Sequence, residues 1–253
     1  MKRFFVFLLS AVLFASAFNV CNAAEELHFY VKRGKNHIPP TTDERFLSAF
    51  DENSYYLDNK AAESGEKKLY LTFDAGYENG NVAKILDVLK EENVPAAFFV
   101  LSHFVRTAPE LVTRMLEEGH LVCNHTSRHK NMARLNEEEF CNELERLDAL
   151  YQEVTGKRLS RFYRPPEGTF SLANLATAKK MGYKTVFWSL SYKDWNDDIA
   201  TEKERALEIL KENTHPGAIV LLHPTTAQNT EILREMITYW RAEGYSIASI
   251  DTI

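Results

Sequence analysis

Side chains that can bind a cation or transfer a proton stand directly after several short apolar segments of this chain. In chain order they are Asp74, His125, His129, Asp194 and His223, and Arg164 and Trp195 stand at the same kind of position. The carboxyl ends of parallel strands open on one rim of a barrel, so groups far apart in the sequence converge there. Imidazoles and carboxylates that meet at one rim could bind a cation there.

His125 and His129 are the clearest pair of candidate ligands. They are four residues apart, a spacing that on one helical turn places both imidazoles on the same side, able to hold one cation. Taken singly, the signals have plainer interpretations: ordinary histidines, a helix N-cap at Asp74, and a structural ion pair at Arg164. Three further histidines are interpreted as background residues: His103, His120 and His215.

A repeated alternation of strand and helix would position these groups. β-branched or aromatic runs predict strands at Leu69–Phe73, Ala96–Leu101, Leu121–Cys123, Arg161–Tyr163, Thr185–Leu190, Ala218–Leu222 and Ser246–Ile250. Amphipathic segments predict helices at Val82–Glu92, Pro109–Glu118, Glu137–Thr155, Leu172–Met181, Glu202–Glu212 and Glu231–Glu243. Such alternation needs a parallel sheet covered by helices. We expect an α/β fold, a distorted (β/α)7 barrel of parallel strands with an N-terminal arm, rather than an open sheet, because no glycine-rich dinucleotide fingerprint follows the first strand.

Size and charge narrow the class of protein. With 253 residues, 45% of them hydrophobic, the chain can bury a full core without disulfide staples. A formal net charge of -6 does not favour a nucleic-acid partner, and an anionic polymer would have to be bound by local positive groups or a metal. Cys123 and Cys141 are interpreted as two buried thiols, while a bridge between them stays open.

The first residues have the pattern of an export signal. Lys2 and Arg3 precede an apolar run from Phe4 to Phe18, and Cys21-Asn22-Ala23 offers small residues for cleavage. The run is shorter than the roughly 18 to 20 residues of a spanning helix, although an uncleaved anchor stays open. We divide the chain into a signal peptide (1–23), an irregular arm packed on the domain (24–67) and the α/β domain (68–253). We expect a monomer with transient membrane contact through the signal.

Taken together, the short motifs are more specific than any one residue. In order they are Thr72-Phe73-Asp74-Ala75-Gly76, His125-Thr126-Ser127-Arg128-His129, Arg164-Pro165-Pro166-Glu167-Gly168, Asp194-Trp195 and Leu222-His223. This set resembles the motifs of the polysaccharide deacetylases, carbohydrate esterase family 4 with its NodB homology domain, from about Lys68 to Ile253. Three further segments look like the delta-lactam branch, whose members de-N-acetylate muramic acid in spore-cortex peptidoglycan: Lys35-Asn36-His37-Ile38-Pro39-Pro40, Tyr77-Glu78-Asn79-Gly80 and His215-Pro216-Gly217-Ala218-Ile219.

The resemblance implies a catalytic role for four residues. Asp74 would be the general base that takes a proton from the attacking water. Arg164 would hold the Asp74 carboxylate ionised and aimed, with Asp194 holding the guanidinium in turn. His223, whose unperturbed pKa is near neutral, would protonate the leaving amine.

The resemblance also implies a substrate site. Its expected residues are Glu167, whose backbone N–H would bind the oxyanion, Trp195 and Leu222 as walls of the acetyl pocket, Pro165 and Tyr77. A muramic residue without its stem peptide exposes a lactyl carboxylate. Its partner could be Arg128, Lys193 or Arg134, although each is interpreted first as solvated surface charge.

Metal binding departs from the family pattern at one position. His125 and His129 would hold a divalent cation, Zn2+ by expectation, that polarises the acetyl carbonyl. Family members usually carry an aspartate ligand directly after the base, but Ala75 stands there and cannot coordinate. With two protein ligands the metal affinity should fall and the sensitivity to chelators should rise.

These observations support one leading hypothesis and two alternatives. The first is an exported, metal-assisted enzyme of the cell envelope or the spore-cortex side of the membrane that removes acetyl from N-acetylmuramic acid of peptidoglycan. The second keeps the chemistry but acts on peptidoglycan N-acetylglucosamine or chitooligosaccharides. The third, motivated by Ala75, is a catalytically silent glycan-binding barrel.

Overall fold

The computed structural model of the chain describes residues 25–34, 36–196 and 201–253. The expected signal segment, residues 1–23, lies outside the described residues. Within the described part of the chain, each helix is too short or too polar to cross a membrane.

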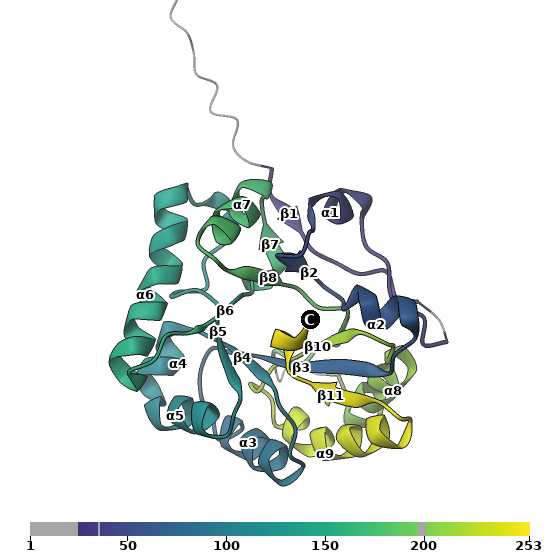
Figure 1. Cartoon of the computed structure of the whole chain (residues 1–253). Helices are drawn as coiled ribbons and strands as arrows, with labels where there is room; N and C mark the ends of the chain where they lie inside the picture. Colours follow the sequence, from purple (N-terminus) through teal and green to yellow (C-terminus); the bar gives the residue numbers. More distant parts are fainter. Residues whose placement is uncertain (1–24, 35, 197–200) are drawn as a thin grey trace, which may run out of the picture.

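The core of the fold is a curled sheet whose strands run parallel (Figure 1). Its strands are β3 (Lys68–Ala75), β4 (Ala97–Val100), β5 (Leu121–Asn124), β6 (Ser160–Tyr163), β8 (Lys184–Val186), β9 (Leu190–Ser191), β10 (Ala218–Leu222) and β11 (Ser246–Ala248). Pairing runs β8-β6-β5-β4-β3-β10-β9, and β11 pairs with the first half of β3. Only three residues separate β8 from β9, so the chain itself connects these two distant strands of the path. The expected distorted barrel is confirmed, and the strand expected at Thr185–Leu190 is interrupted into β8 and β9.

Helices surround the barrel (Figure 1). They are α3 (Val82–Glu91), α4 (Ser102–Thr107), α5 (Pro109–Glu117), α6 (Glu137–Thr155), α7 (Leu172–Lys180), α8 (Lys203–Asn213) and α9 (Ala227–Ala242). Short 3-10 helices lie at Met132–Arg134, Pro166–Gly168 and Ile250–Thr252. The sequence missed α4, a six-residue helix too short to show periodicity, and placed the start of α9 four residues late. A capping box at Asn136 and a left-handed Gly156 set the ends of α6, which match the prediction.

Alternation along β3 explains how the strand serves both the core and the rim. Leu69, Leu71 and Phe73 belong to the large apolar core shared with the helices. Tyr70 belongs to the inner cluster, which also contains buried Cys123. Since side chains alternate across a strand, Thr72 and Asp74 share the inward side with Tyr70. Both Cys123 and the half-buried Cys141 are free, so they form no bridge.

The N-terminal segment is more regular than expected. It contains β1 (Leu27–His28), α1 (Glu44–Ala49), β2 (Ser54–Tyr55) and α2 (Asn59–Ser64), so the prediction of an irregular arm is wrong in this respect. Strand β1 pairs antiparallel with β7 (Thr169–Phe170), and β2 extends the main sheet beside β8. The missed helices are six residues long and begin with aspartate caps at Asp43 and Asp58.

Candidate active site

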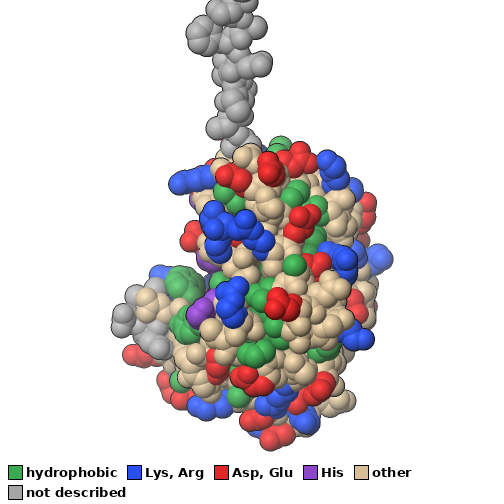
Figure 2. All heavy atoms as spheres, turned by 90° about the vertical axis from the view of Figure 1, so that its left-hand side faces the viewer, with side chains coloured by type: hydrophobic (Ala, Val, Ile, Leu, Met, Phe, Trp, Pro, Cys, Tyr) green, Lys and Arg blue, Asp and Glu red, His purple; other side chains and the backbone are tan. Residues whose placement is uncertain are grey.

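A cavity of about 510 Å³ opens at the carboxyl ends of the barrel strands. Its lining residues are Asp74, His125, His129, Glu167, Trp188, Ser191, Tyr192, Trp195, Leu221 and His223. In the space-filling view, histidine side chains lie in an indentation of the surface beside hydrophobic side chains (Figure 2). Imidazoles, a carboxylate and aromatic walls therefore meet in one hollow, although they come from strand ends far apart in the sequence.

Arg164 is a fully buried cation beneath this cavity, and Asp74 is its counter-ion. Its Nη1 donates to Asp74 Oδ1 at 2.8 Å, and its Nη2 donates to Thr72 Oγ1 at 2.9 Å. The Val186 and Phe187 carbonyls accept its remaining hydrogen bonds, and the guanidinium carbon lies 4.2 Å from the Phe99 ring centroid. The guanidinium is thus held in one orientation by strands on three sides.

The Asp74 carboxyl stays ionised despite its position. Burial alone would raise its pKa, but the charge and hydrogen bond of Arg164, together with the charge of His223, outweigh burial and lower the pKa below its usual value. Asp74 Oδ1 is committed to the guanidinium, whereas Oδ2 faces His125 Nε2 at 3.5 Å. One carboxylate oxygen is therefore anchored and the other is directed to the imidazole side of the cavity.

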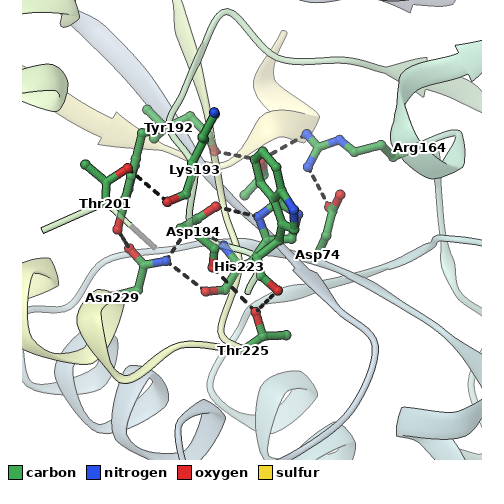
Figure 3. A network of polar contacts seen from close by, with 12 residues as sticks. Asp74, Arg164, Tyr192, Lys193, Asp194, Thr201, His223, Thr225 and Asn229 are labelled. Atoms are coloured by element: carbon green, nitrogen blue, oxygen red, sulfur yellow. Dashed lines mark hydrogen bonds and ion pairs between the residues drawn. The ribbon is translucent and has the colours of Figure 1, made fainter. Parts of the chain in front are cut away.

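Asp194 does not hold the Arg164 guanidinium, which corrects the expectation from the sequence. Its Oδ1 lies 2.7 Å from His223 Nδ1, and its Oδ2 accepts the His223 backbone N–H at 2.8 Å (Figure 3). The reason is strand order: Asp194 follows β9, whose partner β10 leads into His223, while Arg164 follows β6. Burial lowers the pKa of His223, but the charge and hydrogen bond of Asp194 outweigh it, so the pKa is raised overall.

His125 and His129 lie on a loop after β5, not on a helical turn as their spacing suggested. Thr126 and His129 have positive φ angles of 75° and 54°, which bend the loop back. Asn124 Oδ1 accepts the Thr126 N–H, and Thr126 Oγ1 accepts the His129 N–H. The two rings nevertheless lie 5.1 Å apart between centroids, in an edge-to-face arrangement.

The donor set of this loop fits a divalent cation with two protein ligands. His125 Nδ1 lies 2.9 Å from the Arg164 carbonyl oxygen, which only accepts, so the hydrogen is on Nδ1 and the Nε2 lone pair faces the cavity. Burial lowers the pKa of His125 to about 4, which keeps the ring neutral. The Nε2 lone pair then faces the Asp74 carboxylate, and a cation or a hydrogen-bond donor is needed beside these two acceptors.

Ala75 adds nothing to this set, as expected. Its methyl group packs in the helix-facing core, on the opposite side of β3 from Asp74. In residues 25–34, 36–196 and 201–253, no three His, Cys, Asp or Glu side chains are grouped so that they could hold a metal.

The turn after β6 brings Glu167 to the cavity. Glu167 has a φ of 57°, a left-handed conformation uncommon for a residue with a Cβ, while the Gly168 N–H donates to the Pro165 carbonyl. An added Cβ at Gly168 would meet the Trp188 ring at 2.8 Å, so glycine is required for the turn to pack on Trp188. Exposed Glu167 lines the cavity from this turn.

Of the other residues expected to bind substrate, only some line the cavity. Trp195 lines the cavity and is half-exposed, whereas exposed Tyr77 and buried Pro165 are outside its lining. Leu222 packs in the helix-facing core, and its neighbour Leu221 lines the cavity instead. The reason is register: Leu221 lies beside inward-facing Thr72, and Leu222 beside outward-facing Phe73.

The proposed partners of a lactyl carboxylate are already engaged in two of three cases. Arg128 donates from its backbone N–H and its Nε to the buried Glu143 carboxylate, which fixes the histidine loop to α6. Arg134 donates to Glu26 at 2.8 Å. The structure also adds a cation that sequence reasoning missed, because Arg33 of the arm donates to the carbonyl of Ser191, a cavity residue.

Sequence reasoning also missed residues that hold the site. Thr72 could have been found, since it lies two residues before Asp74 and shares its face of the strand. Trp188 also lines the cavity, although a tryptophan is by default a packing residue. Asn229 on α9 gave no signal, because nothing in its local sequence distinguishes it from a surface amide.

The barrel holds the buried Asp74, the pair His125 and His129, and His223 at one mouth. This combination of fold and side chains is that of a hydrolase. The chain belongs to the polysaccharide deacetylase family: the profile of that family matches residues 61–186, and a curated member is 38% identical over 90% of the chain. It is therefore a carbohydrate deacetylase.

Individual relatives resemble the chain over most of its length. The peptidoglycan-N-acetylmuramic acid deacetylase PdaA of Bacillus subtilis is 38% identical over 90% of this chain and 86% of its own. The solved structure of that protein, a family 4 carbohydrate esterase, superposes with a TM-score of 0.84 over 90% of this chain and 96% of that chain. A family 4 carbohydrate esterase from Bacillus anthracis, 37% identical, superposes with a TM-score of 0.70 over 88% of this chain and 95% of its own. A peptidoglycan-N-acetylglucosamine deacetylase of Bacillus cereus is 34% identical over 61% of this chain and 55% of its own.

Proposed function

We propose that this protein is an exported, metal-assisted deacetylase that removes acetyl from N-acetylmuramic acid of peptidoglycan, in the formation of muramic delta-lactam. The observation that carries the proposal is the meeting of Asp74, His125 and His223 in one cavity, with Asp74 anchored by Arg164 and His223 by Asp194. The proposal includes the division of the chain into a signal peptide (1–23), an arm (24–67) and a deacetylase domain (68–253).

The reaction needs a base, an acid and an oxyanion site. The ionised Asp74 carboxylate takes a proton from water while the water oxygen forms a bond to the acetyl carbonyl carbon. The backbone N–H of Glu167 donates to the developing oxyanion. His223 then delivers a proton from Nε2 to the nitrogen as the C–N bond breaks, which releases acetate and a free amine.

The protonation states of the two catalytic groups suit these tasks. The lowered pKa of Asp74 keeps it a base, and the raised pKa of His223 favours the protonated form that an acid requires. A divalent cation held by His125 and His129 would add Lewis-acid polarisation of the acetyl carbonyl.

Muramic acid is favoured over glucosamine by two observations. The similarity to the muramic acid deacetylase spans 90% of the chain, whereas the similarities to two glucosamine deacetylases span 61% and 74%. Muramic acid also carries a lactyl carboxylate next to the acetamido group. The exposed Arg33 beside Ser191 has no acidic partner within the described residues and can bind this carboxylate at the rim.

Acetate release tests the proposal directly. Mature protein supplied with Zn2+ is incubated with glycan strands of peptidoglycan stripped of stem peptides, with chitooligosaccharides, and with intact peptidoglycan. We expect the fastest release from the stripped muramyl strands and none from the Asp74→Asn variant. Faster release from chitooligosaccharides would show that the substrate is N-acetylglucosamine. If the folded protein binds glycan without releasing acetate, the proposed deacetylase activity is refuted.

A further inference from the structure

We propose that Asn229, oriented by Tyr192, is a positioning residue for the acid His223, and that it acts by fixing the Asp194 carboxylate. The inference rests on the proposed role of His223 and extends the site to the buried face of α9. Figure 3 shows the four side chains as one connected network next to Asp74 and Arg164.

Asn229 holds Asp194 and the backbone of His223 at the same time. Its Nδ2 donates to Asp194 Oδ2 at 2.7 Å and to the His223 carbonyl at 2.8 Å. Asp194 Oδ2 also accepts the His223 backbone N–H, so this oxygen is occupied by two donors. Asp194 Oδ1 is then left for the imidazole, which it meets at 2.7 Å from Nδ1.

Tyr192 decides which way the Asn229 amide points. The Tyr192 hydroxyl lies 2.6 Å from Asn229 Oδ1 and donates to it. Burial and the nearby charge of Asp194 raise the pKa of Tyr192, which keeps this hydroxyl a donor. With Oδ1 so occupied, the amide must direct its NH2 group toward Asp194, since a flipped amide would place oxygen against a carboxylate.

Burial makes this arrangement rigid. Asn229 and Asp194 are fully buried, so water does not replace a lost contact easily. A carboxylate without the Asn229 donor can rotate about its Cβ–Cγ bond and meet the imidazole with poorer alignment. His223 would then lose the hydrogen bond that directs its Nε2 into the cavity, while the ion pair of Asp74 and Arg164, which does not involve Asp194 or Asn229, keeps its contact.

Leaving groups with different proton requirements can reveal this role. Hydrolysis of the acetamide needs a proton on the departing nitrogen, whereas 4-nitrophenyl acetate releases a stable phenolate without one. Both substrates use the same base and oxyanion donor. We expect Asn229→Ala to lower kcat on the muramyl glycan by about ten- to a hundredfold with KM unchanged, and to change kcat on the aryl ester less than about twofold.

Three further variants complete the design. Tyr192→Phe removes only the hydroxyl and should give a smaller loss of the same amide-selective kind. Thr230→Ala changes a half-buried neighbour on α9 whose hydroxyl bonds only to the Ala227 carbonyl, and it should match the wild type on both substrates. His223→Ala should show the amide-selective loss in its largest form, which calibrates the comparison.

The outcomes separate this inference from the proposed function. Suppose that His223→Ala loses activity selectively on the amide. If folded Asn229→Ala then loses activity equally on both substrates, or loses none, the role of Asn229 alone is overturned. A non-selective loss in His223→Ala would overturn both the acid role and this inference. If the wild type cleaves only glucosamine oligomers, the muramic assignment fails. The role of Asn229 is then decided by comparing the loss of kcat on those oligomers with the loss of kcat on the aryl ester.

Discussion

Asp74 has two duties, as counter-ion of a buried cation and as proposed base, and the Asp74→Asn substitution should reveal both. Arg164 is fully buried, and among the described residues Asp74 is the one carboxylate within ion-pair distance of it, at 2.8 Å. Removing one partner of a buried ion pair costs about 3–5 kcal/mol, because the other charge is left uncompensated. The carbonyl of the introduced amide would keep one acceptor near the guanidinium, so we expect about 3 kcal/mol, the lower end of that range. For a chain of this size each kcal/mol shifts Tm by about 2–4 °C, which gives a decrease of about 6–12 °C.

A double-mutant cycle separates the charge from the chemistry. Arg164→Met removes the cation and leaves an apolar side chain against the Phe99 ring. The double variant with Asp74→Asn should be more stable than the sum of the single effects by about 2–3 kcal/mol, because no buried charge remains. Its deacetylase activity should stay at the Asp74→Asn level, at least about a hundredfold below wild type, since the base is absent.

Thermal and urea unfolding followed by circular dichroism measure the stabilities, and acetate release measures the activity. Glu137→Gln is the matched control, because Glu137 pairs with Lys180 on the surface with both side chains more than half exposed. It should change the free energy of unfolding by less than about 0.5 kcal/mol. If Asp74→Asn abolishes activity while Tm stays within about 1 °C of wild type, the counter-ion reasoning is wrong.

Three more predictions concern metal, pH and substrate charge. A chelator should lower the rate of acetate release at least about tenfold. Added Zn2+ should restore the rate in the wild type but not in folded His129→Gln, and an unchanged rate after verified metal removal would exclude a metal role. Burial lowers the pKa of His215 to about 4, so between about pH 6.5 and 4 the unfolded chain takes up a proton that the folded chain does not. The free energy of unfolding should therefore fall with decreasing pH, by about 1.4 kcal/mol per pH unit from this residue, and His215→Gln should have a flatter slope in urea titrations; equal slopes contradict the assignment. Arg33→Gln should raise KM for muramyl glycan about tenfold and leave chitooligosaccharide turnover unchanged, since one charge-assisted hydrogen bond of about 1.5 kcal/mol is lost; equal effects on both substrates would argue against lactyl recognition.

The strands and most helices could be predicted because their signals are local. Apolar runs such as Leu69–Phe73 and Ala218–Leu222 can only be buried, and the amphipathic pattern of Glu137–Thr155 matches α6 at both ends. Six-residue helices such as α1 and α4 escaped, because they contain too few turns for periodicity to show.

Side-chain partners could not be predicted in the same way, as two residues illustrate. Asp194 was expected beside Arg164, but β9 pairs with β10, so the neighbour of Asp194 is His223. Leu222 was expected at the cavity, but the register of β10 against β3 turns Leu221 inward instead. The catalytic roles of the site residues stay a prediction until the variants are measured.

The sequence alone determined which chemical groups are present and that they follow the strands, because motif chemistry and apolar periodicity are properties of short segments. Only the tertiary structure decided which groups touch. Strand order, register and a loop bent at Thr126 and His129 set those contacts, and α9 brings Asn229 under Asp194 from a position no motif marks. Such contacts depend on how distant segments pack against one another, and that information is spread over the whole chain.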